Sequence, residues 1–331
     1  MTRYEIVKAT LDHQQTYKVP SCIHLAGDGW EKYSDQLFDR YVDDALRNLC
    51  EEGKLSRQHA IYYGMGNHVL CVSCPWWDWY DLPKSYYEDE DTPDYLPKTI
   101  GTGSYSEFAE TVRKLKEHTD AYVLVLIWGS HFEKAYFSRG IENFLADLAA
   151  EPEYAQRLLD FIIHKNMVML ENIVHTPGVD GILLGSDWGA QTDLLMSPEC
   201  WKSMIAPGEK KEYDLIHSAG VDVWVHSCGN IQRILPELKQ MGVDALNPIQ
   251  PECMDIYAIK EKYGDKITFW GGISTQQTLP YGTPEDVAAE TRKVTEALSK
   301  NGGYIIAPSQ EIQADVPFEN LCALIDTANK L

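Results

Sequence analysis

Short apolar runs rich in Val, Ile and Leu recur along the chain, and each is followed by a turn and a stretch with helical periodicity. Several runs are apolar at every position, which is typical of strands covered on both faces of a sheet. The pattern predicts eight strands, at residues 19–25, 67–74, 121–128, 179–185, 221–228, 243–249, 266–272 and 303–308. It predicts helices near residues 35–52, 106–118, 141–175, 197–218, 230–241, 254–263, 284–300 and 317–330.

Strands that alternate with helices in this way indicate an α/β protein with a parallel sheet. Closure into a single (β/α)8 TIM barrel over residues 1–331 fits the strand count best, and an open doubly wound sheet is the alternative. Neither GxGxxG nor GxxxxGK[ST] follows a predicted strand, which argues against the common nucleotide-binding uses of such a sheet. Because the strand ends of a barrel converge on one mouth, we expect the chemistry there.

The charge balance narrows the classes of partner. The chain has 29 Lys and Arg residues against 50 Asp and Glu residues, which gives a net charge of -21. A surface this acidic offers a phosphate backbone little to pair with, so nucleic-acid binding is not expected. No apolar run is long enough to span a membrane, so a cytoplasmic protein without membrane association is expected. The eight irregularly spaced cysteines are expected to be reduced, and some are available to bind metal.

The clearest candidate site lies at the end of the fifth predicted strand, where one residue separates His226 from Cys228. Alternate residues of a strand point to the same side, so the imidazole and the thiol can share a ligand. Nitrogen and sulfur donors favour zinc, and the alternative is a packed histidine beside a buried cysteine. Candidates for a further ligand are Asp187, Cys253, Gln310, Glu311 and the second same-side pair, Cys22 and His24.

Other polar residues at strand ends are candidates for catalysis and for substrate binding. Asp187 and His131 each follow a predicted strand and could act as a general acid or base, with a structural role as the alternative. Neutral amides would orient a ligand at the same mouth without demanding a charged one. These amides are Gln191, Gln250, Gln276 and Gln310.

Aromatic residues cluster in the segment from Trp76 to Tyr95, which is long for a loop between a strand and a helix. Such loops are often lids or binding loops. We therefore predict a long aromatic-rich loop after the second strand that covers the barrel mouth, with an oligomer contact or a hydrophobic plug as the alternative. The aromatic residues expected to bind substrate are Trp76, Trp77 and Trp188. Cys71 and Cys74, which have the spacing CxxC, are expected to be core or pocket thiols.

A combination of motifs between residues 181 and 326 resembles the uroporphyrinogen decarboxylase (URO-D) superfamily. The resemblance implies a (β/α)8 barrel, in agreement with the strand count. It also implies either a cofactor-free decarboxylase or a zinc-dependent methyltransferase that exchanges methyl groups with a corrinoid protein. The motifs are SDWG at 186–189 with SPE at 197–199, HSCGN at 226–230, GVDALNPIQ at 242–250, WGGISTQ at 270–276, GTPEDV at 282–287, and GGY at 302–304 with VPFEN at 316–320.

Two departures from the family patterns bear on the choice of branch. The decarboxylases resemble one another in an arginine-bearing loop after the first strand, whereas residues 24–30 read HLAGDGW. A polyanionic substrate would therefore lack charge-assisted donors, which disfavours uroporphyrinogen as the substrate. The methyltransferases use a His-x-Cys pair, which His226 and Cys228 match, and a later Cys. Residues 308–311 read PSQE without a Cys, so Glu311 is the expected substitute ligand.

The resemblance and the residues together predict a methyltransferase of the O-demethylase type. It would move a methyl group from a small methoxylated or methylated substrate to a corrinoid protein, with zinc as the Lewis acid. One alternative is a metal-free decarboxylase of a smaller acid, in which Asp187 stabilises a protonated intermediate. A second alternative is a ligand-binding barrel without catalysis. Because barrels of this superfamily often pair, a homodimer is a further expectation.

Overall fold

The chain divides into two compact units. We describe them from a computed structural model that covers residues 1–79 and 99–331. Unit 1 comprises Met1–Cys71, Arg113–Val123 and Asp244–Leu331, and unit 2 comprises Val72–Val112 and Leu124–Val243. Within the covered ranges, no helix combines the length and the apolar character that a membrane crossing requires.

The fold is α/β, with strands and helices alternating along most of the chain as in a TIM barrel. A seven-stranded sheet has the strand order β1-β4-β5-β6-β7-β8-β9. All residues of β5, β7, β8 and β9 are buried, which confirms that apolar runs without alternation mark strands covered on both faces. The strands are β1 (Val69–Ser73), β4 (Tyr122–Ile127), β5 (Gly181–Gly185), β6 (Asp222–His226), β7 (Ala245–Ile249), β8 (Thr268–Ile273) and β9 (Tyr304–Pro308).

The first predicted strand, at residues 19–25, is wrong, so the sheet has seven of the eight expected strands. This segment makes only isolated parallel bridges, from Ser21 to Ile306 and from Leu25 to Ile312. Two backbone amides of this segment, which would donate to a neighbouring strand in a regular ladder, donate to side chains instead. The amide of Ser21 donates to Nδ1 of His68, and the amide of Ile23 donates to Oδ1 of Asn67. These bonds satisfy the backbone locally in place of a regular ladder.

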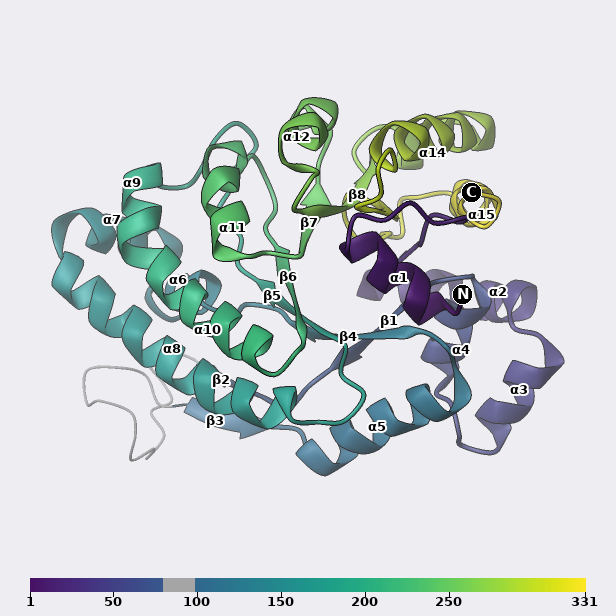
Figure 1. Cartoon of the computed structure of the whole chain (residues 1–331), viewed down its shortest axis with the longest axis horizontal. Coiled ribbons are helices and arrows are strands. Elements are labelled where there is room, and N and C mark those ends of the chain that lie inside the picture. Colours follow the sequence, from purple (N-terminus) through teal and green to yellow (C-terminus); the bar gives the residue numbers. More distant parts are fainter. Residues whose placement is uncertain (80–98) are drawn as a thin grey trace. The chain divides into compact units, whose positions relative to one another are not determined.

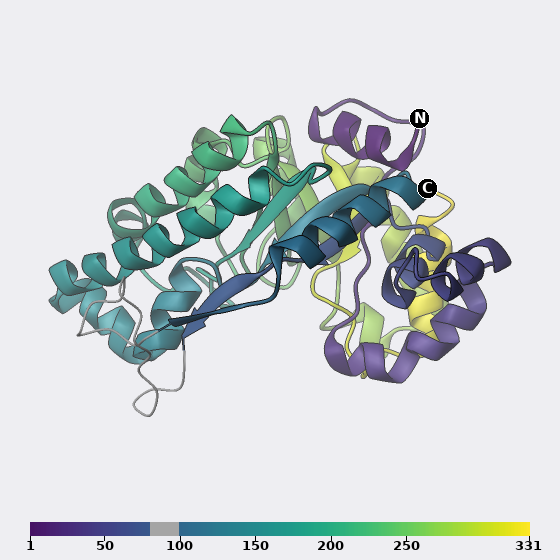
Figure 2. The ribbon, with the colours of Figure 1, turned by 90° about the horizontal axis from the view of Figure 1, so that it is seen from below.

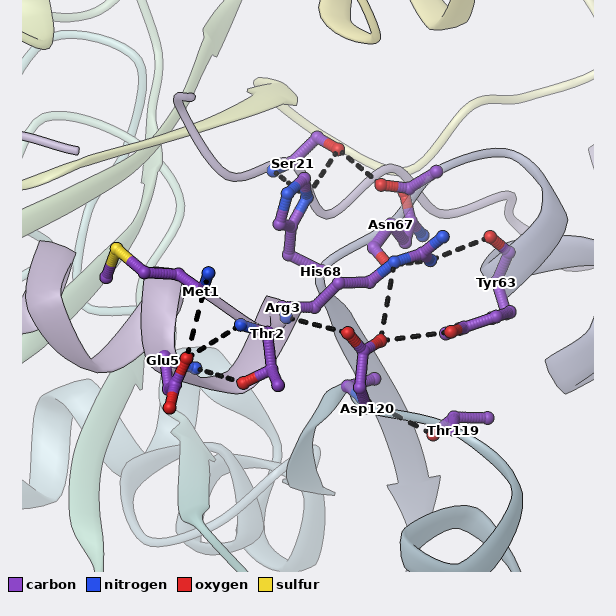
Figure 3. Close-up of polar contacts among 12 residues, drawn as sticks. Met1, Thr2, Arg3, Glu5, Ser21, Tyr63, Asn67, His68, Thr119 and Asp120 are labelled. Carbon is purple, nitrogen blue, oxygen red and sulfur yellow. Dashed lines mark hydrogen bonds and ion pairs between the residues drawn. The ribbon is translucent and has the colours of Figure 1, made fainter. Parts of the chain in front are cut away.

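In unit 1 the structure has an N-terminal helix that the periodicity did not predict, and Arg3 is one of the residues that fix it (Figure 3). Arg3 donates to the carbonyl oxygens of Tyr63 and Asn67 at 2.8 Å and lies over the Tyr63 ring. Arg40 donates to Asp326 at 2.8 Å. The two chain ends lie near each other (Figures 1 and 2). The helices are α1 (Arg3–Leu11), α2 (Gly27–Tyr41), α3 (Asp44–Glu51), α4 (Arg57–Gly64), α12 (Ile256–Tyr263), α13 (Thr278–Tyr281), α14 (Pro284–Leu298) and α15 (Phe318–Ala328), and α5 (Tyr105–His118) enters from unit 2.

In unit 2 the predicted helix at 141–175 is two helices, because Pro152 occupies the first turn of the second one. Long apolar faces pair α8 with α10 along their lengths (Figures 1 and 2). The helices are α6 (Phe132–Arg139), α7 (Ile141–Ala150), α8 (Pro152–Val174), α9 (Pro198–Cys200), a π-helical turn (Trp201–Ile205), α10 (Ala206–Ser218), a 3-10 turn (Gln232–Ile234) and α11 (Leu235–Met241).

The predicted aromatic loop begins as a strand. β2 (Trp76–Trp79) pairs antiparallel with β3 (Thr99–Thr102), a two-stranded sheet that the periodicity did not predict. The rest of the predicted loop, including Tyr80, Tyr86, Tyr87 and Tyr95, lies outside the described residues.

Candidate functional site

The strongest candidate site is in unit 2, at the end of β6. Asp187, His226 and Cys228 each offer one ligand atom, and these atoms lie within 4.8 Å of one another. Sγ of Cys228 is 3.3 Å from Nε2 of His226, and Oδ1 of Asp187 is 3.6 Å from the same nitrogen. The histidine side chain is 6% exposed and the aspartate side chain is 33% exposed. The cluster is therefore buried on its imidazole side and open to solvent on its carboxylate side.

The local backbone brings these three side chains together. The Cys228 amide donates to Oδ1 of Asp187 at 2.8 Å, which joins the end of β6 to the segment after β5. Gly189 and Gly229 allow the two segments to approach, because a Cβ on Gly189 would lie 2.6 Å from the Cys228 carbonyl oxygen. Gly229 also has a φ of 81°, which side-chain-bearing residues rarely adopt. Asp187 thus caps the turn and also faces the imidazole.

Glu133 and Tyr136 on α6 interact electrostatically with this cluster. Tyr136 donates to Oε1 of Glu133 at 3.1 Å, and the Gly129 amide donates to Oε2 at 3.1 Å. Burial, together with the negative charge of Asp187, raises the pKa of Glu133 to about 7. Burial and the neighbouring Glu133 raise the pKa of Tyr136 well above its usual value. Glu133 is therefore a carboxyl that can hold a proton near neutral pH. It lies within a helix rather than at a strand end, so the strand pattern gives no signal for it.

His131, predicted as a catalytic residue, lies inside a buried polar network of unit 2. It is 1% exposed, and its Nδ1 is 3.3 Å from Oε1 of Glu209. Tyr213 donates to the other oxygen of Glu209 at 3.1 Å, and Asn166 donates to Oε1 of Glu212 at 2.7 Å. Burial and the charge of Glu209 raise the pKa of Glu212 well above its usual range. This arrangement separates His131 from solvent.

The three tryptophans predicted to bind substrate lie in unit 2 and differ in how far they are buried. Trp188 is fully buried and packs edge-on against Trp201 at 5.3 Å between ring centroids. Trp77 is 7% exposed and donates through Nε1 to Asn166 at 2.9 Å. Trp76 is half-buried and has the Lys134 ammonium 3.5 Å from its ring centroid. Gln191, the predicted amide of this unit, is exposed.

In unit 1 the structure brings the other predicted amides together. Gln250, Gln276 and Gln310 line one cavity of about 380 Å³, and Glu311 lies on the same wall. Burial raises the pKa of Glu311, and its charge also interacts with His24 and Cys71. Its assignment as a ligand beside His226 and Cys228 stays a prediction. The cavity is polar enough to hold a small ligand by hydrogen bonds.

Comparison with known proteins decides the family. The model of the family described as uroporphyrinogen decarboxylase (URO-D) matches residues 84–331, about three quarters of the chain. The chain belongs to the URO-D family. The resemblance noted in the motifs of residues 181–326 is thereby confirmed.

Relatives of this URO-D protein include methyltransferases. The methylated-thiol–coenzyme M methyltransferase of Methanosarcina mazei is 23% identical over 260 residues, which cover 75% of this chain and 65% of that protein. The methylcobamide:CoM methyltransferase MtbA of the same organism is 25% identical over 241 residues, which cover 72% of this chain and 68% of that protein. The alignment thus leaves about a third of each relative uncovered.

A solved methyltransferase from Methanosarcina mazei shares the fold of this URO-D protein. It has a TM-score of 0.68 and 17% sequence identity, and the match covers 100% of this chain and 99% of that one. The likeness extends to the first 83 residues, which the family model does not match. The α/β fold expected from the strand pattern is therefore supported by both the chain's own strands and this neighbour.

Unit 1 of the URO-D protein also holds a second cluster. Cys22, His24 and Cys71 each offer a ligand atom within 4.8 Å of the others. The strand pattern placed Cys22 and His24 on one side of a segment, but it grouped Cys71 with Cys74. Cys71 lies on β1, so only the pairing of this strand with the N-terminal segment could have indicated the cluster.

Proposed function

We propose that this URO-D family protein is a methyltransferase that moves a methyl group between a small methylated or methoxylated substrate and a corrinoid carried by a partner protein. The observation that carries the proposal is the Asp187, His226 and Cys228 cluster, whose three donor atoms converge within 4.8 Å. Both methyltransferase relatives support the class of reaction. The name of one relative also contains methylcobamide, which supports a corrinoid as the methyl carrier.

The donor set of the cluster fits zinc. Zinc binds imidazole nitrogen, thiolate sulfur and carboxylate oxygen at roughly 2.0 to 2.3 Å, which places tetrahedral ligands about 3.3 to 3.8 Å apart. The two separations from Nε2 of His226, 3.3 Å and 3.6 Å, match this spacing. His226, Cys228 and Asp187 would hold the ion, and their charges would balance it. When bound, zinc would act as a Lewis acid on the atom that leaves the methyl group.

The residues of unit 2 have separate tasks around this site. Trp128 packs edge-on against the His226 ring at 4.8 Å between centroids and fixes its orientation. Ser227 accepts a hydrogen bond from the Trp188 amide at 3.0 Å, which holds the segment carrying Asp187. Glu133, held by Tyr136 and the Gly129 amide, is the carboxyl that would supply a proton to a departing oxygen or sulfur. Its partner Tyr136 keeps the carboxyl oriented through the bond to Oε1.

The substrate class follows from the polar residues available. Gln250, Gln276 and Gln310 offer neutral donors and acceptors at the cavity in unit 1, and Gln191 offers the same chemistry in unit 2. Neutral amides orient an uncharged ligand without charge-assisted bonds. We therefore propose a small substrate without multiple carboxylates.

The test is methyl transfer by the purified full-length protein to cob(I)alamin, followed by the absorbance of methylcobalamin. The substrates are a panel of methylated thiols and methoxylated aromatic compounds. We expect His226→Ala and Cys228→Ala to lose both transfer and one equivalent of zinc, while Cys200→Ala retains both. Transfer by metal-free protein at the wild-type rate would contradict the metal role. Carbon dioxide release from a carboxylated substrate without corrinoid would contradict methyl transfer as the reaction.

A further inference from the structure

Cys22, His24 and Cys71 form a compact group of soft donors in unit 1. Their ligand atoms lie within 4.8 Å of one another, although Cys71 is distant from the other two in sequence. Cys22 is 1% exposed, and its Sγ lies 4.0 Å from the Val69 carbonyl oxygen on β1. The group therefore lies where the N-terminal segment runs beside β1.

Hydrogen bonds from neighbouring residues fix the positions of the ligands. Nε2 of His59 is 3.1 Å from the Cys71 carbonyl oxygen, and Ser56 Oγ lies 2.8 Å from the other nitrogen of that ring. The Cys22 carbonyl accepts from Nε1 of Trp270 at 3.1 Å. Backbones fixed in this way hold metal ligands in place before an ion binds.

The His24 ring is fixed by packing, but one of its nitrogens makes no hydrogen bond within the described part of the chain. It packs on the Tyr62 ring at 4.5 Å between centroids. Its Nε2 is buried and has no hydrogen-bond partner among the residues that the structure covers. A side-chain hydrogen bond joins His24 to Cys71, so the imidazole and this thiol already face one another as two ligands of one ion would.

We propose that Cys22, His24 and Cys71 form a second metal site, which takes a zinc-class divalent ion and is separate from the His226 cluster. Two thiols and one imidazole are a donor set that zinc prefers, and two thiolates would neutralise its charge. Glu311 interacts electrostatically with His24 and Cys71 and lines the cavity of unit 1. The ion would therefore sit near this cavity.

A bound ion would connect the segment at residues 20–25 to β1. This segment lacks a regular ladder: the Ser21 carbonyl accepts from the His68 amide, and the Ser21 and Ile23 amides donate to the side chains of His68 and Asn67. Coordination through Cys22 and His24 on one side and Cys71 on the other would add a link between the two. The site thus has a structural consequence that does not depend on the proposed methyl transfer.

The test uses the full chain with His226→Ala and Cys228→Ser, which remove the other cluster. We titrate it with Co²⁺ after metal removal, because sulfur ligands give charge-transfer absorption. We expect one bound ion with this absorption, and loss of both when Cys71→Ser or Cys22→Ser is added. Cys50→Ser, a free and half-buried cysteine of unit 1, is the matched control and should change neither.

A second measurement covers the case in which a variant fails to fold. In the chain with intact Cys22 and Cys71, Zn²⁺ should slow alkylation by iodoacetamide of Cys71, the less buried of the two thiols, as followed by mass spectrometry of its peptide. Alkylation of Cys50 should be unaffected. Equal alkylation with and without Zn²⁺, or a Cys22–Cys71 disulfide in place of bound metal, would overturn the proposal.

Discussion

The two clusters share an imidazole and a thiol and differ in the third donor. In unit 2, one thiol joins an imidazole and a carboxylate that is one-third exposed. In unit 1, two thiols join an imidazole, and Cys22 is almost fully buried. Zinc sites that act in catalysis keep a position open to substrate, whereas structural sites are closed by protein ligands. Each cluster has one buried and two half-buried ligands, so the clusters differ in donor type rather than in exposure. On that difference, a carboxylate in unit 2 against a second thiol in unit 1, we propose the chemistry for unit 2 and a stabilising role for unit 1.

The largest expected effect is on methyl transfer when the unit 2 cluster is broken. His226→Ala removes the nitrogen that both other ligands face, and Lewis-acid assistance worth several kcal/mol is lost. We expect the rate to fall about 1,000-fold, or about 4 kcal/mol in activation free energy. Initial rates with methylated thiols measure the loss, and Cys200→Ala is the control. A decrease of only a few fold would show that unit 2 is not the catalytic region.

The second effect concerns stability when the unit 1 cluster is broken. Cys71→Ser should lower the free energy of unfolding by about 3 kcal/mol when zinc is present at 100 times its dissociation constant, since binding to the native state stabilises it. The same substitution should have a much smaller effect in excess chelator. Urea unfolding of both proteins, with and without zinc, gives the four values. An equal loss in all conditions would indicate packing rather than coordination.

The buried Glu212 of unit 2 should make the free energy of unfolding fall as the pH rises. Burial and the charge of Glu209 raise the folded pKa of Glu212, so its contribution is complete below the unfolded value of 4.5 and is lost as the pH increases. Glu212→Gln, which retains an acceptor for Asn166, should therefore stabilise the protein at pH 7 and have little effect at pH 4. Greater stabilisation at pH 4 would contradict this.

Unit 1 should respond to pH in the opposite direction (Figure 3). Burial, with a contribution from the charge of Arg3, lowers the pKa of His68 to about 3. Its contribution is complete above the unfolded value of 6.5 and is lost as the pH falls towards 3. At pH 5 the loss is about 2 kcal/mol. His68→Gln should remove this dependence, measured as the change in unfolding free energy between pH 7 and pH 5, and an unchanged slope would contradict it.

The strand pattern predicted most of the fold because apolar runs without alternation record burial on both faces. Seven of eight strands are present, in shorter form. The segment at residues 19–25 has the same apolar character, but it makes isolated bridges rather than a regular ladder of hydrogen bonds with a neighbouring strand. His68 and Asn67, which are distant in sequence, supply the competing hydrogen bonds there. A local pattern could not indicate these partners.

The candidate sites divide in the same way. His226 and Cys228 could be paired from the sequence, because two alternate residues of one strand share a side whatever the rest of the fold does. Asp187 was one of several candidates for the third position, and Glu311 was the preferred one. The hydrogen bond between Asp187 and the Cys228 amide depends on the close approach of Gly189 and Gly229. Glu133 gave no signal, because its raised pKa comes from burial.

The amino-acid sequence alone thus determined the alternation of strands and helices, the membership of the URO-D family and the one-sided placement of His226 with Cys228. These depend on covalent spacing and backbone geometry over a few residues. Tertiary structure alone decided that Asp187 completes one cluster and that Cys71 joins Cys22 and His24 in the other. Donors from separate segments reach coordination distance only when packing brings their backbones together, and the free energy of that packing is distributed over the whole core.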